Sequence, residues 1–333
     1  MHEPEPTAPR PEPFEFSGEG GEFFRIWIVN VVLTILTLGI YSAWAKVRTK
    51  CYFYGHTRLA GSSFDYLASP WVILKGRLVA LAVIVAASLA NAVSPLTGAV
   101  IPLALVFLLP WLVCRAVAFN AANSAWRGVR FGFDGGYGEA FRTYVLWPLA
   151  QMLSFGLLIP FVLRAQHRFL LGNLRFGTTG WSHEAGVGPY YRLILVTGVI
   201  VIGALFVSSV LGGAVTPIAT LIAAAGYIAA ISWFQVGRLN LAFGHLRIGP
   251  HRFQSRFDWG SYLRLQIGNM LGLALTLGLF YPWAKVRNAR YRTERVRLFA
   301  VDDLDRFAAA QEPARTGAAG EEIGEALGLD IGL

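Results

Sequence analysis

Two long stretches of this chain, 78–114 and 193–237, contain no charged residue. Each is about twice the length of the roughly 20 apolar residues that cross the hydrocarbon core of a bilayer as a helix. A sequence typical of a turn interrupts each stretch near its middle, at 91–98 and at 211–217. Because a backbone in hydrocarbon must satisfy its own hydrogen bonds, each stretch is predicted to form a helical hairpin in a membrane.

The composition agrees with a membrane protein, since 55% of the residues are hydrophobic and 15% are charged. The net charge of +9 is spread beside the apolar stretches rather than gathered in one basic domain. We therefore expect basic loops on the cytoplasmic side of a membrane and no nucleic-acid partner. The two cysteines form no spacing motif, and no sequence motif for a cofactor or a metal is found, so neither is expected.

The segment 37–48, TLGIYSAWAKVR, is written again at 276–287 as TLGLFYPWAKVR. A more divergent copy lies between them, within 139–166. Such self-similarity predicts a fold built from internal repeats. Each copy continues an apolar segment and contains glycine or proline, which predicts a bent or re-entrant helix with its break near Gly39.

Polar arms between the apolar segments carry a second, shorter motif centred on arginine. Aromatic residues that favour strands, together with glycine and proline turn signals, predict short β-strands or hairpins in these arms. In three arms an aspartate follows, and we expect it to pair with the arginine of its own arm. The expected pairs are Arg58 with Asp65, Arg130 with Asp134, and Arg247 with Asp258. The repeated arm arginines are Arg58, Arg130, Arg175, Arg247 and Arg297.

These patterns predict a mainly α-helical polytopic membrane protein built from internal repeats, with short β-strand arms that form a small sheet at the cytoplasmic membrane face. The expected parts are a disordered proline-rich leader (1–21), a first repeat (22–136), a second repeat (137–260), a truncated third repeat (261–301) and an acidic tail (302–333).

Two topologies are open at this point. If the bent elements cross the membrane, there are seven spans, and the arms at Arg175 and Arg247 lie opposite the others. If the bent elements are re-entrant, there are four spans and all arms share one side. The second topology gathers the basic residues on one side, as the positive-inside rule favours.

The pattern FxFSGxGGExF at 14–24, followed by NVVLTILTLGIYSAWAKVR at 30–48 and an arm ending in GSSFDY, resembles the bacterial YjgN family of inner-membrane proteins, a domain of unknown function. The resemblance covers roughly residues 14–300 and implies a multi-pass protein of the bacterial inner membrane. It transfers no catalytic residue and no substrate. The middle copy departs from the signature, with Phe161 and Leu163 in place of tryptophan and lysine.

The best candidates for a functional site lie in the two well-preserved copies, where a tryptophan precedes two cations. Tryptophan favours the headgroup boundary, and neighbouring cations attract anionic lipid, so these residues are interpreted as membrane anchors or as a lipid or anion site. They are Trp44, Lys46, Arg48, Trp283, Lys285 and Arg287. Asn30 and Asn269 lie inside apolar segments, where we expect hydrogen bonds between helices; a solute path is the alternative.

We therefore expect a non-enzymatic module of the inner membrane that binds lipid or a protein partner through a basic cytoplasmic face. Membrane lipids, anionic ones among them, are the expected partners. Transport of a small uncharged or lipid-like solute is the first alternative, because repeated broken helices recur in transporters. A lipid-modifying enzyme is the second, disfavoured because no nucleophile or acid–base motif is recognisable in the sequence.

Overall fold

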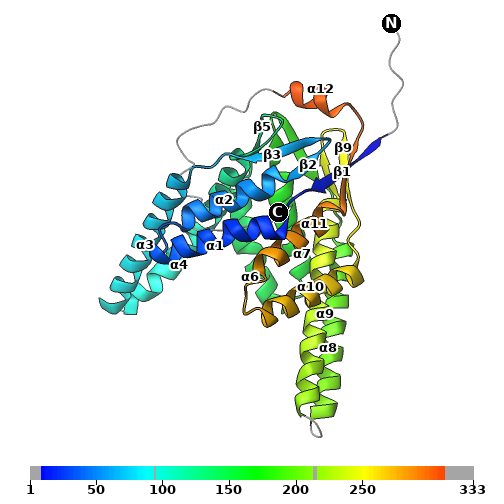
Figure 1. The fold of residues 1–333 in the computed structure, drawn as a ribbon. Coiled ribbons are helices and arrows are strands. Elements are labelled where there is room, and N and C mark those ends of the chain that lie inside the picture. The colour runs from blue at the N-terminus through cyan, green and yellow to red at the C-terminus, as the bar shows by residue number, and fades with distance from the viewer. Residues whose placement is uncertain (1–8, 94, 213–215, 312–333) are drawn as a thin grey trace.

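Ten short strands close into an antiparallel barrel in the part of the chain that the structure describes, namely residues 9–93, 95–212 and 216–311. The structure is a computed structural model, and Figure 1 shows the barrel above the helices that extend from one of its ends. Around the barrel the order is β1-β10-β9-β8-β7-β6-β5-β4-β3-β2. The strands are β1 (Arg10–Phe16), β2 (Thr57–Leu59), β3 (Ser62–Tyr66), β4 (Ser124–Trp126), β5 (Val129–Phe133), β6 (Leu174–Phe176), β7 (Thr179–His183), β8 (Leu246–Ile248), β9 (His251–Ser255) and β10 (Val296–Ala300).

Helical hairpins join the strands in pairs. Each odd-numbered strand leads into a helical hairpin, and the hairpin returns to the next, even-numbered strand, which pairs with the first. Five such units follow one another within the described ranges. The first two hairpins are α1 (Gly20–Leu36) with α2 (Ser42–Gly55), and α3 (Pro70–Val93) with α4 (Pro95–Ala122). In the third hairpin the first arm is divided into α5 (Tyr137–Phe141), the π-helix η1 (Arg142–Leu146) and α6 (Trp147–Leu153), and the second arm is α7 (Ile159–Gly172). The last two are α8 (Gly188–Gly212) with α9 (Thr216–Gly244), and α10 (Trp259–Leu275) with α11 (Tyr281–Thr293).

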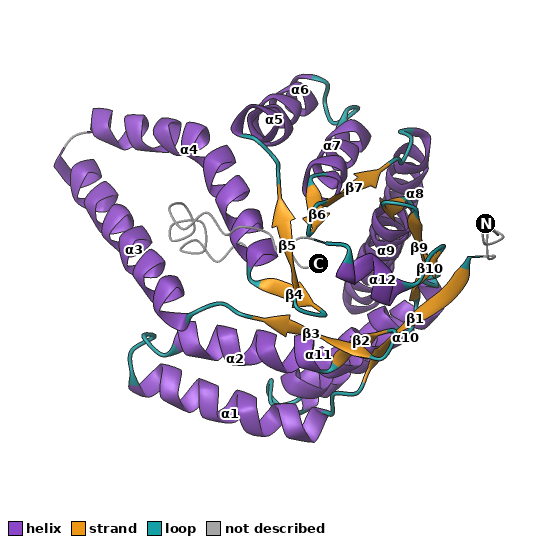
Figure 2. Ribbon diagram, turned by 90° about the horizontal axis from the view of Figure 1, so that it is seen from above, coloured by secondary structure: helices purple, strands orange, loops and turns teal. Residues whose placement is uncertain are grey.

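The two ends of the barrel differ. All five helical hairpins leave from one end, the helix rim, and surround the barrel when it is seen from above (Figure 2). Two-residue turns join consecutive units at the other end, the turn rim. Ala60–Gly61 and Arg127–Gly128 have positive φ at both residues, as type I′ turns require, and Gly177 and Gly249 supply positive φ at the first position of the other two.

Layers of apolar side chains fill the barrel. The odd strands contribute a closed ring of five aromatic residues, in which consecutive ring centroids lie 5.4 to 6.5 Å apart. The residues of this aromatic ring are Phe14, Phe64, Phe131, Trp181 and Phe253. Each pairs across to a buried residue of an even strand, respectively Leu59, Trp126, Phe176, Ile248 and Leu298. The interior is therefore a packed core rather than an open lumen.

A short helix, α12 (Leu304–Ala309), lies across the turn rim. Phe307 stacks on Phe176 with 5.8 Å between centroids and meets the ring of His251 edge-on at 4.6 Å. The side-chain oxygen of Gln311 accepts hydrogen bonds from the backbone N–H groups of Thr178 and Thr179 at 3.0 and 3.2 Å. This helix belongs to the predicted acidic tail, whose part beyond residue 311 lies outside the described residues.

The prediction of a small sheet made from separate arms is wrong, because the arms close into a barrel. The missing partner is β1, in the segment predicted to be a disordered leader, so that prediction is also wrong for 10–16. Pro11 and Pro13 disguise this strand. Both lie in residues 10–13, the half of β1 that pairs with β10 but not with β2. A proline is tolerated there because the side of the residue that lacks an N–H can face away from β10, where no strand needs a donor. Residues 14–16 then pair with β2, which closes the ring.

The predicted break near Gly39 is confirmed, and the same turn occurs in all three bent elements. Leu38, Phe155 and Leu277 have φ of 50°, 51° and 50°, and the glycine that follows each also has positive φ. In the first, Gly39 N–H donates to the Thr34 carbonyl at 2.8 Å and Leu38 N–H to the Ile35 carbonyl at 3.1 Å. This is the Schellman arrangement that ends a helix.

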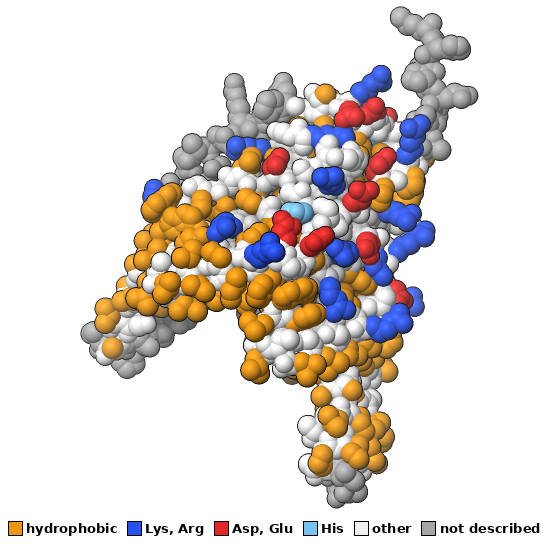
Figure 3. Space-filling view, in the orientation of Figure 1, with side chains coloured by type: hydrophobic (Ala, Val, Ile, Leu, Met, Phe, Trp, Pro, Cys, Tyr) orange, Lys and Arg blue, Asp and Glu red, His pale blue; other side chains and the backbone are white. Residues whose placement is uncertain are grey.

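Four helices of the described chain are long and apolar enough to cross a membrane: Pro70–Leu89, Leu103–Ala122, Gly188–Leu211 and Thr216–Gly244. They belong to the α3–α4 and α8–α9 hairpins, which extend below the barrel in Figure 1, and Figure 3 shows their hydrophobic surface beneath the charged surface of the barrel. The seven-span alternative would place β6–β9 across the membrane from the other strands. It is incompatible with the barrel, in which β6 pairs with β5 and β9 pairs with β10.

Candidate functional site

The predicted tryptophans lie at contacts between neighbouring helical hairpins. Trp44 of α2 meets Trp71 of α3 edge-on at 4.9 Å between centroids, and Trp283 of α11 packs on Phe24 of α1 at 5.0 Å. An aromatic pair also occupies each of the other three contacts between neighbouring hairpins. These pairs are Phe107–Phe141, Phe161–Tyr191 and Trp233–Trp259. The tryptophans therefore hold adjacent hairpins together, a role that Phe161 takes in the middle copy.

The predicted cations lie on the same two helices, α2 and α11, which both pack against α1 (Figure 2). Arg48 donates from Nη1 to the hydroxyl of Tyr41 at 3.0 Å, and Arg287 lies 6.0 Å from the ring of Phe280. Lys285 Nζ lies 5.2 Å from the ring of Phe53, between the first and last hairpins. Arg48 and Arg287 are exposed and Lys46 is half-buried, so these three cations are within reach of a ligand.

The arm arginines lie in the middle of the barrel wall rather than on a membrane-facing sheet. Arg58, Arg175 and Arg247 are the central residues of the three-residue strands β2, β6 and β8. Arg297 is the second residue of β10 and holds the equivalent position, directly before the residue that pairs with the aromatic ring. Arg130 is wrongly grouped with them. It lies in β5, an odd strand, and pairs across to Ala125, which holds the equivalent position in β4.

The predicted pairing within each arm is also wrong. Asp134 follows β5 and accepts from Arg175 of the adjacent β6 at 3.0 Å instead of pairing with Arg130. Asp258 caps α10 by accepting from Ser261 N–H at 2.8 Å, and Arg247 lies 3.5 Å from Glu184. Salt bridges thus link neighbouring strands. No salt bridge joins Arg58 to Asp65 among the described residues.

Asn30 and Asn269 are buried on α1 and α10, with 4% and 3% of their surface exposed. Neither side-chain amide hydrogen-bonds to another described residue. The predicted hydrogen bond between helices is therefore not found at either position. The middle bent element has no equivalent, since Trp147 stacks on Phe161 at the corresponding level.

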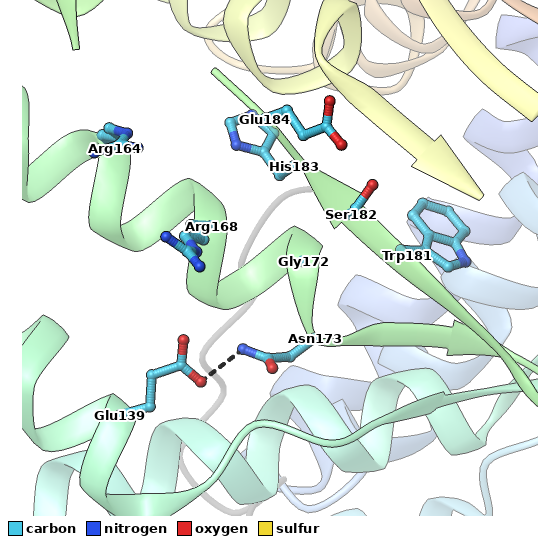
Figure 4. Close-up of a pocket in the computed structure, with 9 residues that line it drawn as sticks. All are labelled: Glu139, Arg164, Arg168, Gly172, Asn173, Trp181, Ser182, His183 and Glu184. Carbon is cyan, nitrogen blue, oxygen red and sulfur yellow. Dashed lines mark hydrogen bonds between the residues drawn. The ribbon is translucent and has the colours of Figure 1, made fainter. Parts of the chain in front are cut away.

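A polar cavity of about 450 Å³ lies between α5, α7 and β7 at the helix rim (Figure 4). We call it the rim pocket. The residues that matter for its chemistry are Glu139, Arg164, Arg168, Asn173, His183 and Glu184. Arg164 and Arg168 are one helical turn apart on α7 and therefore lie on the same face.

The rim pocket contains charges of both signs that are not paired with each other. Arg164 donates from Nε to the carbonyl of Ala185 at 2.9 Å. Glu139 accepts from the neutral amide of Asn173 at 2.9 Å. No ion pair within 4.0 Å engages Arg164, Arg168 or Glu139 among the described residues. The pocket can therefore offer both a cationic and an anionic group to a ligand.

Two buried histidines adjoin this pocket. His183 is hydrogen-bonded through Nε2 to the carbonyl of Leu241 at 3.0 Å, so Nε2 carries the proton and the unpartnered Nδ1 is an acceptor. His167 Nδ1 lies 2.8 Å from the hydroxyl of Tyr190. Burial, followed by the positive charge nearby, lowers the pKa of both, to about 3 for His167. Both are therefore neutral near pH 7.

Acid should destabilise the fold through His167. The unfolded chain takes up a proton on this histidine near pH 6.5 and the folded chain only near pH 3, so stability falls as the pH drops through this window. Between pH 7 and pH 5 the loss from this group should be about 2 kcal/mol. Unfolding of the detergent-solubilised protein at the two pH values measures it. His167→Gln should reduce the pH dependence, and an unchanged slope in this variant would contradict the assignment.

The sequence did not indicate the rim pocket. Its only local signal is the spacing of Arg164 and Arg168 by one helical turn, in an element otherwise interpreted as a degraded repeat. Glu139 and His183 come from α5 and β7, and only closure of the barrel brings them beside α7. Within the described residues, no cluster of three or more His, Cys, Asp or Glu side chains has the geometry to hold a metal ion.

Comparison with known proteins identifies relatives of this chain. The model of a family described as bacterial protein of unknown function (DUF898) matches residues 11–326. The chain is 35% identical over 122 residues to Inner membrane protein YjgN of Escherichia coli O157:H7, which is 36% of this chain and 31% of that protein. It is 31% identical over 140 residues to the protein of the same name from Salmonella typhimurium, covering 42% and 35% of the two chains. The matched segments thus span about a third of each relative. No solved structure matches the chain.

Proposed function

Because the chain belongs to the DUF898 family of bacterial proteins, whose relatives here are named inner membrane proteins, we propose that it is a non-enzymatic, lipid-binding module of the bacterial inner membrane. In this proposal the α3–α4 and α8–α9 hairpins cross the membrane and the barrel lies in the cytoplasm. The three short hairpins enter only the cytoplasmic leaflet. That the units arose as copies of one ancestral sequence stays a prediction.

The observation that carries the proposal is the chemistry of the three bent turns. Leu38, Phe155 and Leu277 are 95%, 98% and 94% exposed, at positions where a left-handed backbone normally favours glycine. In water, a large apolar side chain there would combine backbone strain with exposure. In hydrocarbon, the same exposure is favourable.

The backbone of these turns also meets the requirement of a lipid environment. Thr37 donates its hydroxyl to the carbonyl of Leu33 at 2.7 Å and accepts from the N–H of Tyr41 at 2.9 Å. Thr276 repeats this pattern with the N–H of Phe280 at 2.9 Å. Polar groups that would otherwise need water are thus satisfied within the turn, as burial in hydrocarbon demands.

The packed interior of the barrel argues against transport through it. The aromatic ring and the residues paired with it occupy the axis, and α12 covers the turn rim. The unpaired amides of Asn30 and Asn269 are the feature that favours the transport alternative, and they lie outside the barrel in α1 and α10.

Spin labels at the three turns test leaflet insertion. In a background with Cys51 and Cys114 replaced by serine, labels at positions 38, 155 and 277 should collide more often with oxygen, which partitions into lipid, than with a water-soluble nickel chelate. A label at exposed Arg252 on the barrel is the matched control and should prefer the chelate. Preference for the chelate at all three turns would contradict the proposal.

A further inference from the structure

The rim pocket can distinguish between ligands because its open groups have opposite charge. Its cationic part is formed by Arg164 and Arg168, whose terminal amino groups make no hydrogen bond to another described residue. Two guanidinium groups on one helix face suit a phosphate, which accepts paired hydrogen bonds from each. An uncharged ligand would leave both cations without a counter-charge.

The acceptors of the pocket come from two other elements, Glu139 from α5 and His183 with Glu184 from the end of β7 (Figure 4). Glu139 has only the amide of Asn173 as a partner, at 2.9 Å, and keeps capacity to accept further hydrogen bonds. His183 Nδ1 is a buried acceptor without a partner among the described residues. Glu184 forms a long salt bridge with Arg247, with 3.5 Å between Oε2 and Nη1. A ligand that fits these acceptors carries a positively charged group with several N–H donors, such as a primary ammonium.

We propose that the rim pocket binds a phosphoethanolamine group, with its phosphate on the two arginines of α7 and its ammonium on Glu139 and His183. The phosphate of such a group lies two carbons from its ammonium, so one compact ligand can offer a partner to both the arginines and the acceptors of the pocket. A choline group has no N–H to donate, and a glycerol group has no positive charge. Both should therefore bind more weakly.

The position of the pocket favours a lipid as the source of this group. Helix α7 begins at Ile159, immediately after the exposed turn at Phe155. Arg168 lies nine residues further along, about 14 Å at the rise of an α-helix. If the turn lies in the hydrocarbon of one leaflet, Arg168 reaches the headgroup layer of the same leaflet. This assignment to lipid rests on the proposed function, whereas recognition of the phosphoethanolamine group does not.

Native mass spectrometry of the detergent-solubilised protein tests the site. Short-chain phosphatidylethanolamine should bind at least about tenfold more tightly than phosphatidylcholine or phosphatidylglycerol of the same chain length. Arg168→Gln and Glu139→Gln should each abolish this preference. Arg252→Gln, which removes an exposed arginine on the barrel wall, should keep it. Equal binding of the three lipids, or an unchanged preference in both pocket variants, would overturn the site.

Soluble glycerophosphoethanolamine separates the two sources of the ligand. Weak binding of this compound beside strong binding of the lipid supports the lipid assignment, and equally tight binding overturns it in favour of a soluble metabolite. The pocket variants should leave the spin-label depth at position 155 unchanged. If the unsubstituted protein shows no ethanolamine selectivity while position 155 has the expected depth, the site alone is refuted. If its turns are accessible to the chelate while selectivity is intact, the membrane module alone is refuted.

Discussion

Removing residues 1–16 should abolish accumulation of folded protein. This deletion takes away β1, which pairs with β10 through residues 10–13 and with β2 through residues 14–16. It opens the barrel, exposes two strand edges and removes Phe14 from the aromatic ring. Fluorescence-detected size-exclusion chromatography of the solubilised membranes should show a loss of the monodisperse peak of at least about tenfold.

The matched control is a deletion of residues 1–8, which leaves β1 intact and should keep the peak. Phe14→Ala offers a milder test, because it preserves the strand and removes only the ring from the core. The expected loss of stability is about 3 kcal/mol, as for other large-to-small core changes. Normal yield and stability after removal of 1–16 would show that β1 is dispensable and that the barrel does not need to close.

Single cysteines on the barrel should all react from the cytoplasmic side of the membrane. Suitable exposed positions in a cysteine-free background are Asp65, Gly180, Arg252 and Arg297, which lie on β3, β7, β9 and β10. A membrane-impermeant maleimide should label them in inverted vesicles and leave them at background in intact spheroplasts. The physical reason is that the strands form one barrel, and all five helical hairpins, including the four helices proposed to span the membrane, leave from one end of it.

Positions at the far ends of the spanning hairpins supply the opposite control. Ala92 of α3 and Thr216 of α9 should label in spheroplasts and be protected in inverted vesicles. Barrel positions divided between the two sides would contradict the four-span arrangement. Barrel positions that all label in spheroplasts would preserve that arrangement and reverse its orientation.

The four long apolar helices could be predicted because a membrane requires long segments of apolar composition. A stretch such as 193–237, long and free of charge, has few soluble alternatives, and a turn sequence in its middle divides it into two helices. The bend near Gly39 was predictable for a similar reason, since glycine next to an apolar helix end marks a left-handed position. Both features are local, so they can be recognised from a short stretch of sequence without knowing the rest of the fold.

The barrel could not be predicted in the same way. Strands β2, β4, β6 and β8 have three residues each, too few to show the alternation that identifies a strand. Strand β1 contains two prolines, which argue against a paired strand unless its unpaired side is known. The rim pocket inherits this difficulty, because Glu139, Arg168 and His183 come together only when β5, β6 and β7 are neighbours.

Pairing of β1 with β10 also imposes an order on biosynthesis. Strand β1 (Arg10–Phe16) leaves the ribosome long before β10 (Val296–Ala300), which is one of its two partners. At roughly 5–20 residues per second, the nascent strand waits on the order of tens of seconds. Insertion of the apolar hairpins during this interval would hold the strands already made at one membrane surface. Strands β1 and β10 would then find each other by diffusion along that surface rather than through the volume of the cytoplasm.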